Sequence, residues 1–224
     1  DAYPYDQSVV VTGNEVNDYF RVVLAALARV FPDLAAKTRH ISHGMLRLPT
    51  GKMSSRAGNV VTAEAMIDQL AALVGEKNSA LDKAAREQIA VGALKYQILK
   101  QAPGHDVVFD AARAVSFEGD SGPYLQYTVV RARSVLNKSE KTPGAASTAT
   151  ADFLPRLLLR FPEVGARAAR DFAPQLFLKY LLDLAGAFNA FYAKEKIIGS
   201  EQEDYRLALT AAAAQVLQNG LNLL

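Results

Sequence analysis

The sequence predicts a mainly α-helical protein in which a short α/β segment precedes a helical bundle. Two observations lead to this fold class. In roughly the first 62 residues, apolar side chains follow a strand–helix–strand order, which is typical of an α/β layer. After residue 62, apolar side chains recur every three to four positions, as they do on the buried face of a helix. Because half of the 224 residues are hydrophobic, the chain can bury a sizeable core.

The α/β segment begins with an apolar, β-branched run. Residues 8–12 read SVVVT and are followed by Gly13, which predicts a buried strand. Residues 14–31 place their apolar side chains on one helical face, and Pro32 is expected to end that helix. A second strand is predicted within residues 40–48.

The helical part is divided by capping residues, glycines and prolines. Thr62 is expected to cap a helix that ends at Gly75, and Ser79 is expected to cap the next one. Gly122 and Pro123 predict the start of a third helix, because proline is preorganised for the first helical turn. After a small, polar loop over residues 141–150, four more helices are predicted, over residues 153–160, 163–172, 175–194 and 201–219.

Composition excludes several kinds of site. The chain has no cysteine, which excludes disulfides and thiolate metal sites, and it has only three histidines, so no protein-bound metal is predicted. No apolar run is long enough to cross a bilayer and the first residues are not a signal peptide, so we expect a cytoplasmic protein with no membrane partner. The net charge of +2 does not decide for or against nucleic acid. Because the chain starts without Met and ends abruptly, we expect it to be a piece of a longer protein.

One polar loop is a candidate phosphate-binding site. Residues 50–59 read TGKMSSRAGN and are too polar for a core. Lys52 and Arg56 supply two cations. Ser54 and Ser55 supply hydroxyl donors, and the glycines let a ligand approach the backbone. Such a loop can wrap a polyphosphate and stabilise developing charge, or it can be a solvated turn. It is not a P-loop, because the first glycine of that motif is missing.

A second candidate site lies on the third predicted helix of the helical part. Tyr124, Tyr127 and Arg131 are three and then four residues apart, so they share one helix face. Two aromatic rings and a guanidinium can stack unpaired bases and pair with phosphate. Arg133 and Lys138 add charge nearby. The alternative is that the tyrosines pack between helices. Three later aromatic residues are expected in the core: Phe188, Phe191 and Tyr192.

Several segments resemble one enzyme family. Residues 52–60, KMSSRAGNV, resemble the KMSKS signature of class I aminoacyl-tRNA synthetases. Further segments resemble arginyl-tRNA synthetases, in order along nearly the whole chain: residues 43–52, 60–66, 93–96, 117–127, 188–192, 205–209 and 216–224. The resemblance implies the C-terminal remnant of a Rossmann-like α/β catalytic domain over residues 1–75, followed by an α-helical anticodon-binding domain over residues 76–224.

The resemblance also implies a role for the polar loop. In the family this loop closes over ATP, which binds with Mg²⁺, and stabilises pyrophosphate as arginyl-adenylate forms. Lys52 and Ser54 match the signature and are the implied catalytic residues together with Arg56. Ser55 stands where a second lysine is usual, so Arg56 or a lysine outside this chain is expected to replace it.

Two other places are implied to contact ATP. Glu15, after Gly13, is expected to accept hydrogen bonds from the ribose hydroxyls. The alternative is an acidic residue that the helix dipole favours in a first turn. Backbone groups of His43, Gly44 and Met45 are expected to meet the adenine. A catalytic base at His43 is a further alternative to a structural histidine.

The implied enzyme is not complete in this chain. Class I synthetases need a His-x-Gly-His motif in the first half of their nucleotide-binding domain, and this sequence contains no such motif. The resemblance implies that the arginine pocket belongs to the same missing half. We therefore expect no aminoacylation by this chain alone. Its expected partners are arginine tRNAs, ATP and, through the missing half, arginine. The helical part is implied to be the domain named for Asp-Ala-Leu-Arg, whose nearest match here is residues 92–95. The alternatives are a cysteine-type class I synthetase, a non-catalytic tRNA-binding module and a purely structural helical adaptor.

Overall fold

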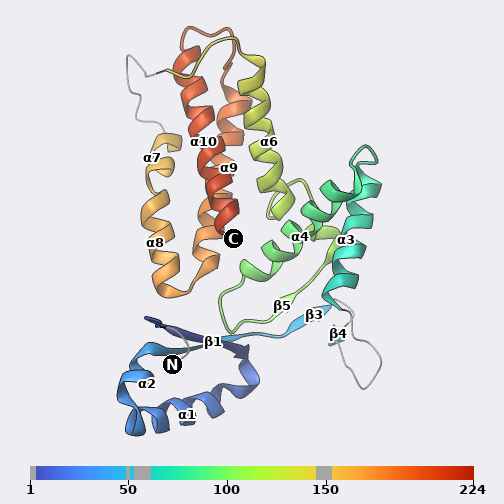
Figure 1. The fold of residues 1–224 in the computed structure, drawn as a ribbon. Coiled ribbons are helices and arrows are strands. Elements are labelled where there is room, and N and C mark those ends of the chain that lie inside the picture. The colour runs from blue at the N-terminus through green and yellow to red at the C-terminus, as the bar shows by residue number, and fades with distance from the viewer. Residues whose placement is uncertain (1–3, 49–50, 53–61, 145–152) are drawn as a thin grey trace. The chain divides into compact units, whose positions relative to one another are not determined.

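The computed structural model describes residues 4–48, 51–52, 62–144 and 153–224, and of residues 51–52 it describes the backbone only (Figure 1). The chain forms two compact units. The first contains Asp1–Val60 and Gln101–Phe109, and the second contains Val61–Lys100 and Asp110–Leu224. The fold is mainly helical, as the sequence predicts.

The first unit has α/β order. Strand β1 (Ser8–Gly13) is followed by the short 3₁₀ helix η1 (Asn14–Val16) and by helices α1 (Asn17–Val30) and α2 (Pro32–Lys37). Strand β2 (Thr38–His43) then pairs in parallel with β1, from Ser8 opposite Thr38 to Gly13 opposite His43. The predicted first strand and helix are confirmed, and the helix ends just before Pro32 as expected.

The strand predicted within residues 40–48 is in fact two strands, β2 and β3 (Leu46–Leu48). Between them the Met45 N–H donates to Asp106 Oδ1 at 2.8 Å, and the Met45 carbonyl accepts from the Val107 N–H at 3.0 Å. Strand β3 continues this pairing, in parallel with β5 (Val107–Val108) and antiparallel to β4 (Gly51–Lys52). A segment some sixty residues later in the chain therefore causes the break, which no local pattern could predict.

The second unit begins with two helices that pack together. Helix α3 (Ala63–Lys77) has the predicted cap, because the Thr62 hydroxyl accepts from the Ala65 N–H at 3.2 Å. It continues past Gly75, where the sequence predicted its end. Helix α4 (Lys83–Leu99) is capped by Asp82 and not by Ser79. Both residue types are good caps, but here the Arg86 side chain bonds the carbonyls of residues 79 and 81 and holds them as the turn before the helix.

The remaining helices form the larger part of the second unit. They are α5 (Ala111–Ala114), α6 (Gly122–Lys138), α7 (Phe153–Leu159), α8 (Phe161–Asp171), α9 (Pro174–Lys194) and α10 (Glu203–Leu223). The helices predicted in this region are confirmed with ends shifted by a few residues, and proline stands in the first turn of α6, α8 and α9. The predicted loop over residues 141–150 lies largely outside the described residues.

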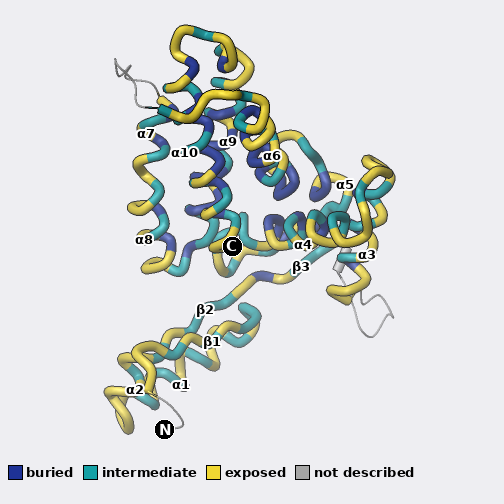
Figure 2. The backbone as a smooth tube through the Cα atoms, turned by 45° about the horizontal axis from the view of Figure 1, so that its top comes forward, coloured by how far each residue is buried: buried dark blue, intermediate teal, exposed yellow. Residues whose placement is uncertain are grey.

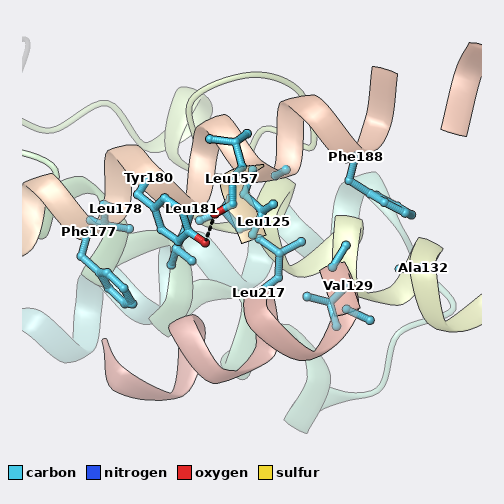
Figure 3. Close-up of a cluster of buried hydrophobic side chains, with 14 of the residues drawn as sticks. Leu125, Val129, Ala132, Leu157, Phe177, Leu178, Tyr180, Leu181, Phe188 and Leu217 are labelled. Carbon is cyan, nitrogen blue, oxygen red and sulfur yellow. Dashed lines mark hydrogen bonds between the residues drawn. The ribbon is translucent and has the colours of Figure 1, made fainter. Parts of the chain in front are cut away.

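Helices α6, α9 and α10 enclose the main core (Figures 2 and 3). Leu125, Leu181 and Leu217 have no exposed surface there. Helix α10 approaches α9 so closely at Gly220 that an added Cβ would lie 2.4 Å from a methyl group of Leu181. The Tyr180 hydroxyl donates to the Leu157 carbonyl at 2.9 Å and ties α9 to α7. This packing fixes the side chains that α6 and α9 present to solvent.

The structural units divide the chain differently from the predicted domains. The prediction places residues 63–75 with the α/β segment, whereas the structure groups all of α3 with the helices. Residues 101–109 return to the first unit through the pairing of β5 with β3. The predicted boundary between the two domains, at residue 75, therefore stays a prediction.

Candidate nucleic-acid interface

A groove of about 450 Å³ lies in the second unit, along α6 and the end of α9. Helix α6 lines one side, and the last turn of α9 with the residues that follow it lines the other. The lining residues are Tyr127, Val130, Arg131, Ser134, Val135, Lys138, Tyr192, Glu195, Ile197 and Ile198. Aromatic rings, two cations and aliphatic side chains therefore face the same space.

Arg131 is held between two exposed aromatic rings. Its guanidinium carbon lies 4.8 Å from the centre of the Tyr127 ring and 5.3 Å from the centre of the Tyr192 ring. Both distances are within the range of cation–π attraction. Tyr127 is 44% exposed and Tyr192 is 43% exposed, so each ring keeps surface for a ligand.

Asn189 of α9 orients the Arg131 side chain through hydrogen bonds. Its side-chain oxygen accepts a hydrogen bond from Arg131, and its nitrogen donates to the Tyr124 hydroxyl at 2.9 Å and to the Thr128 hydroxyl at 3.0 Å. Because guanidinium can only donate, the amide oxygen has to face Arg131. The amide thus connects α9 to three residues of α6 and restricts the rotamer of Arg131.

The structure brings together part of the set that the sequence singled out. Tyr127 and Arg131, which the sequence placed on one helix face, line the groove together with Lys138, which was expected to add charge nearby. Tyr124 is half-buried and its hydroxyl is bound to Asn189, so it supports the groove without lining it. Arg133 is exposed but is not among the lining residues.

No site role was predicted from the sequence for two residues of α9: Tyr192, which lines the groove, and Asn189, which holds Arg131. Tyr192 was predicted in the core with its aromatic neighbours, and this is wrong because its ring is exposed beside Arg131. Phe188 is fully buried as predicted, and Phe191 packs partly against the core. Asn189 was not considered at all. Spacing on α9 could have shown that Tyr192 and Asn189 share a face, but not that this face meets Arg131.

The predicted ATP residues of the first unit are only partly described. Glu15 is exposed, and its carboxylate lies over Gly13, where an added Cβ would be 2.2 Å away. Lys52 pairs through its backbone with Arg47, and its side chain lies outside the description. Ser54, Ser55 and Arg56 lie outside the described residues.

The residues predicted to face adenine already have partners within the unit. His43 is exposed, and its Nδ1 lies 2.9 Å from the Gly44 carbonyl oxygen. Gly44 is buried so close to the His105 backbone that an added Cβ would be 2.1 Å from its carbonyl oxygen. That approach accounts for glycine at this position without a ligand. The Met45 N–H is bound to Asp106, so it is not a free donor for adenine.

Within the described part of the chain, metal-binding clusters and membrane-spanning helices are both absent. No group of three or more histidine, cysteine, aspartate or glutamate side chains there could hold a metal ion. No helix there is long and apolar enough to cross a membrane.

Part of the helical unit is similar to a known domain family. Residues 125–224 match the DALR anticodon binding domain family. The match includes every residue that lines the groove.

Comparison of the whole chain is more specific. Over 99% of its length it is 36% identical to an arginine–tRNA ligase of Treponema denticola, of which it covers 41%. It is 34% identical to that of Halobacterium salinarum over 99% of this chain and 37% of the relative. The arginyl-tRNA synthetase of Thermus thermophilus superposes on 97% of this chain and 40% of its own, with a TM-score of 0.84 and 29% identity. The enzyme of Plasmodium falciparum shares the fold, with a TM-score of 0.81 and 20% identity over 97% of this chain and 40% of its own. The chain is thus a homologue of the arginine–tRNA ligases and corresponds to the C-terminal part of these proteins, about 40% of their length.

Proposed function

We propose that this chain is the anticodon-binding and loop-bearing part of an arginine–tRNA ligase, which attaches arginine to its tRNA through arginyl-adenylate. One observation carries the proposal. The groove that holds Arg131 between two tyrosines lies wholly inside residues 125–224, the stretch that matches an anticodon-binding family. The similarity to that family and the chemistry of the groove therefore both favour this groove as the RNA-binding surface.

The groove has the chemistry that single-stranded RNA requires. Unpaired bases stack on exposed aromatic rings, and such stacking contributes roughly 1–3 kcal/mol per base. Tyr127 and Tyr192 offer these rings, while Arg131 and Lys138 supply positive charge for phosphates. Because Asn189 fixes Arg131 before binding, little side-chain freedom is lost when RNA arrives.

We propose that the α/β unit contributes to ATP binding. Lys52 and Arg56, with the hydroxyl of Ser54, are proposed to offset the negative charge that develops on the pyrophosphate of ATP. Glu15 is exposed and can accept hydrogen bonds from ribose hydroxyls. Mg²⁺ would enter with ATP and screen its phosphates. Since the chain spans about 40% of its relatives, we propose that arginine binding and aminoacylation need the rest of the protein.

Capture of total cellular tRNA tests the proposal. The protein is immobilised at low and moderate salt, and the bound tRNAs are sequenced. We expect enrichment of arginine isoacceptors, and we expect Arg131→Gln to weaken their binding about tenfold, because a stacked cation and its phosphate partner are lost. Arg170→Gln on α8 is the matched control, since it removes an exposed arginine that does not line the groove. Indiscriminate tRNA binding, or an equal loss in both variants, would contradict the proposal.

A further inference from the structure

One wall of the groove is an irregular segment, residues 195–202, which connects α9 to α10. It contributes Glu195, Ile197 and Ile198 to the lining. It also contains Gly199, whose φ of 72° is a conformation that side chains other than glycine rarely adopt. Connecting segments of this kind are usually mobile, so a fixed wall requires specific anchors.

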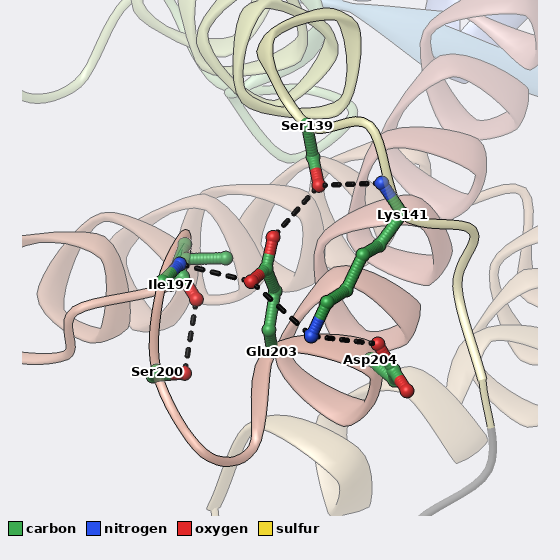
Figure 4. A network of polar contacts seen from close by, with 7 residues as sticks. Ser139, Lys141, Ile197, Ser200, Glu203 and Asp204 are labelled. Atoms are coloured by element: carbon green, nitrogen blue, oxygen red, sulfur yellow. Dashed lines mark hydrogen bonds and ion pairs between the residues drawn. The ribbon is translucent and has the colours of Figure 1, made fainter.

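The first anchors come from packing and from Glu203 in the first turn of α10. Ile197 is 5% exposed and packs with Val135 of α6 and Leu207 of α10. The Glu203 carboxylate accepts from the Gly199 N–H at 2.9 Å and from the Ser139 hydroxyl at 2.8 Å (Figure 4). Glu203 therefore joins the segment to the end of α6.

The remaining anchor is Arg206, one turn further along α10. One of its terminal nitrogens donates to the Lys196 carbonyl at 2.6 Å, and the other lies 2.7 Å from the Glu195 carboxylate. The Arg206 side chain is 19% exposed and that of Glu195 is 33% exposed, so the pair is partly shielded from water. A planar guanidinium can hold a carbonyl and a carboxylate at once, which a lysine does less well.

The negative charge of Glu195 would oppose phosphate binding in the groove, and Arg206 offsets that charge. A groove that binds phosphates should not contain an unpaired carboxylate, because like charges in a partly buried site repel by several kcal/mol. Glu195 lines the groove with Arg131 and Lys138. Its ion pair with Arg206 cancels its charge and turns its carboxylate toward α10.

We propose that Arg206 is a positioning residue for RNA binding: through its ion pair it neutralises Glu195 in the groove and turns that carboxylate toward α10. Arg206 is not itself among the groove-lining residues, so it acts through Glu195 and not through contact with RNA. This inference rests on the proposed function of the groove.

The test uses the full-length ligase that contains this chain, with arginine tRNA as the probe and binding measured over a range of salt concentrations. We expect Arg206→Gln to weaken binding about tenfold at low salt. This is the size of effect expected when the uncompensated Glu195 carboxylate repels a bound RNA phosphate. Adding Glu195→Gln to that variant should restore the affinity to within about twofold of the unchanged protein. Restoration requires a charge effect, because a purely structural loss would persist in the double variant.

Glu195→Gln alone is the second arm. It leaves Arg206 unpaired and adds one net positive charge, so we expect binding that is equal or tighter. It also keeps the inference testable if Arg206→Gln fails to fold, which thermal unfolding would reveal. Weakening by Glu195→Gln alone, or a double variant as weak as Arg206→Gln, would overturn the inference.

A matched control separates this inference from the proposed function. Arg170→Gln and Asp171→Asn break another arginine–carboxylate pair, 3.1 Å apart on α8 and away from the groove lining. Neither should change the affinity by more than about twofold, as expected for exposed pairs. If the unchanged ligase does not prefer arginine tRNA, the proposed function fails. If it does and Arg206→Gln binds equally well, only this inference fails.

Discussion

The two units differ most in how they use their apolar side chains. Residues 4–43, which form β1, η1, α1, α2 and β2, contain no buried residue, and Val11 and Val22 are more than 60% exposed (Figure 2). In the helical unit, Leu181, Leu184 and Phe188 of α9 have no exposed surface. Both units contain apolar side chains, but within the described residues only the helical unit encloses a core of them.

The difference separates local from tertiary causes of structure. A pair of parallel strands cannot cover both of its own faces, and parallel sheets are normally buried on both sides. The helical unit has enough long helices to surround a core with its own residues. We therefore expect the helical unit to carry most of the folding free energy of this chain.

The largest expected effect is a loss of core packing in α9. Leu181→Ala should destabilise the helical unit by roughly 2–5 kcal/mol, because it removes buried methyl groups and leaves a cavity. Val11→Ala, in the exposed face of β1, should change stability by less than about 0.5 kcal/mol. Denaturant unfolding followed by circular dichroism of the helices measures both. Equal costs would show that the α/β unit has a core of its own.

A smaller effect is expected at the link between α9 and α7. Tyr180→Phe removes the hydrogen bond to the Leu157 carbonyl and should cost about 1 kcal/mol at neutral pH. Burial raises the pKa of Tyr180 to about 12, whereas a free tyrosine ionises near 10. Its contribution is therefore present below about pH 10 and is lost as the pH rises toward 12. Chemical unfolding at pH 7 and pH 11 should show a gap that narrows, and a constant gap would contradict this reasoning.

The smallest effect should appear only in acid. Hydrogen bonds from the Gly199 N–H and the Ser139 hydroxyl hold the pKa of Glu203 below its usual value. Because the folded pKa is lowered, the stabilisation is present above the free value of about 4.3 and is lost as the pH falls below it. The melting temperature of the natural chain should thus fall more between pH 6 and pH 3 than that of Glu203→Gln. Parallel curves for the two proteins would refute a stabilising carboxylate.

The sequence predicted local features of the fold and of the groove better than the contacts between distant segments. The cap at Thr62 and the proline start of α6 were found because each depends on a few adjacent residues. The shared face of Tyr127 and Arg131 followed from helical periodicity. The break at Gly44 was missed, because residues 105–107 cause it from a distant part of the chain.

By itself the sequence determined most of the helices, the cap at Thr62 and the aromatic and basic face of α6, since these follow from backbone preferences and residue spacing. It also carried the resemblance to arginyl-tRNA synthetases, through motifs that stay readable without coordinates. Only the tertiary structure decided that Asn189 and Tyr192 of α9 meet Arg131, and that Arg206 of α10 neutralises Glu195 in the groove. The physical reason is that helix packing brings Arg131 to residues about sixty positions away, and Arg206 to Glu195 across the segment that joins α9 to α10. The free energy of that packing depends on the whole core and not on any local pattern.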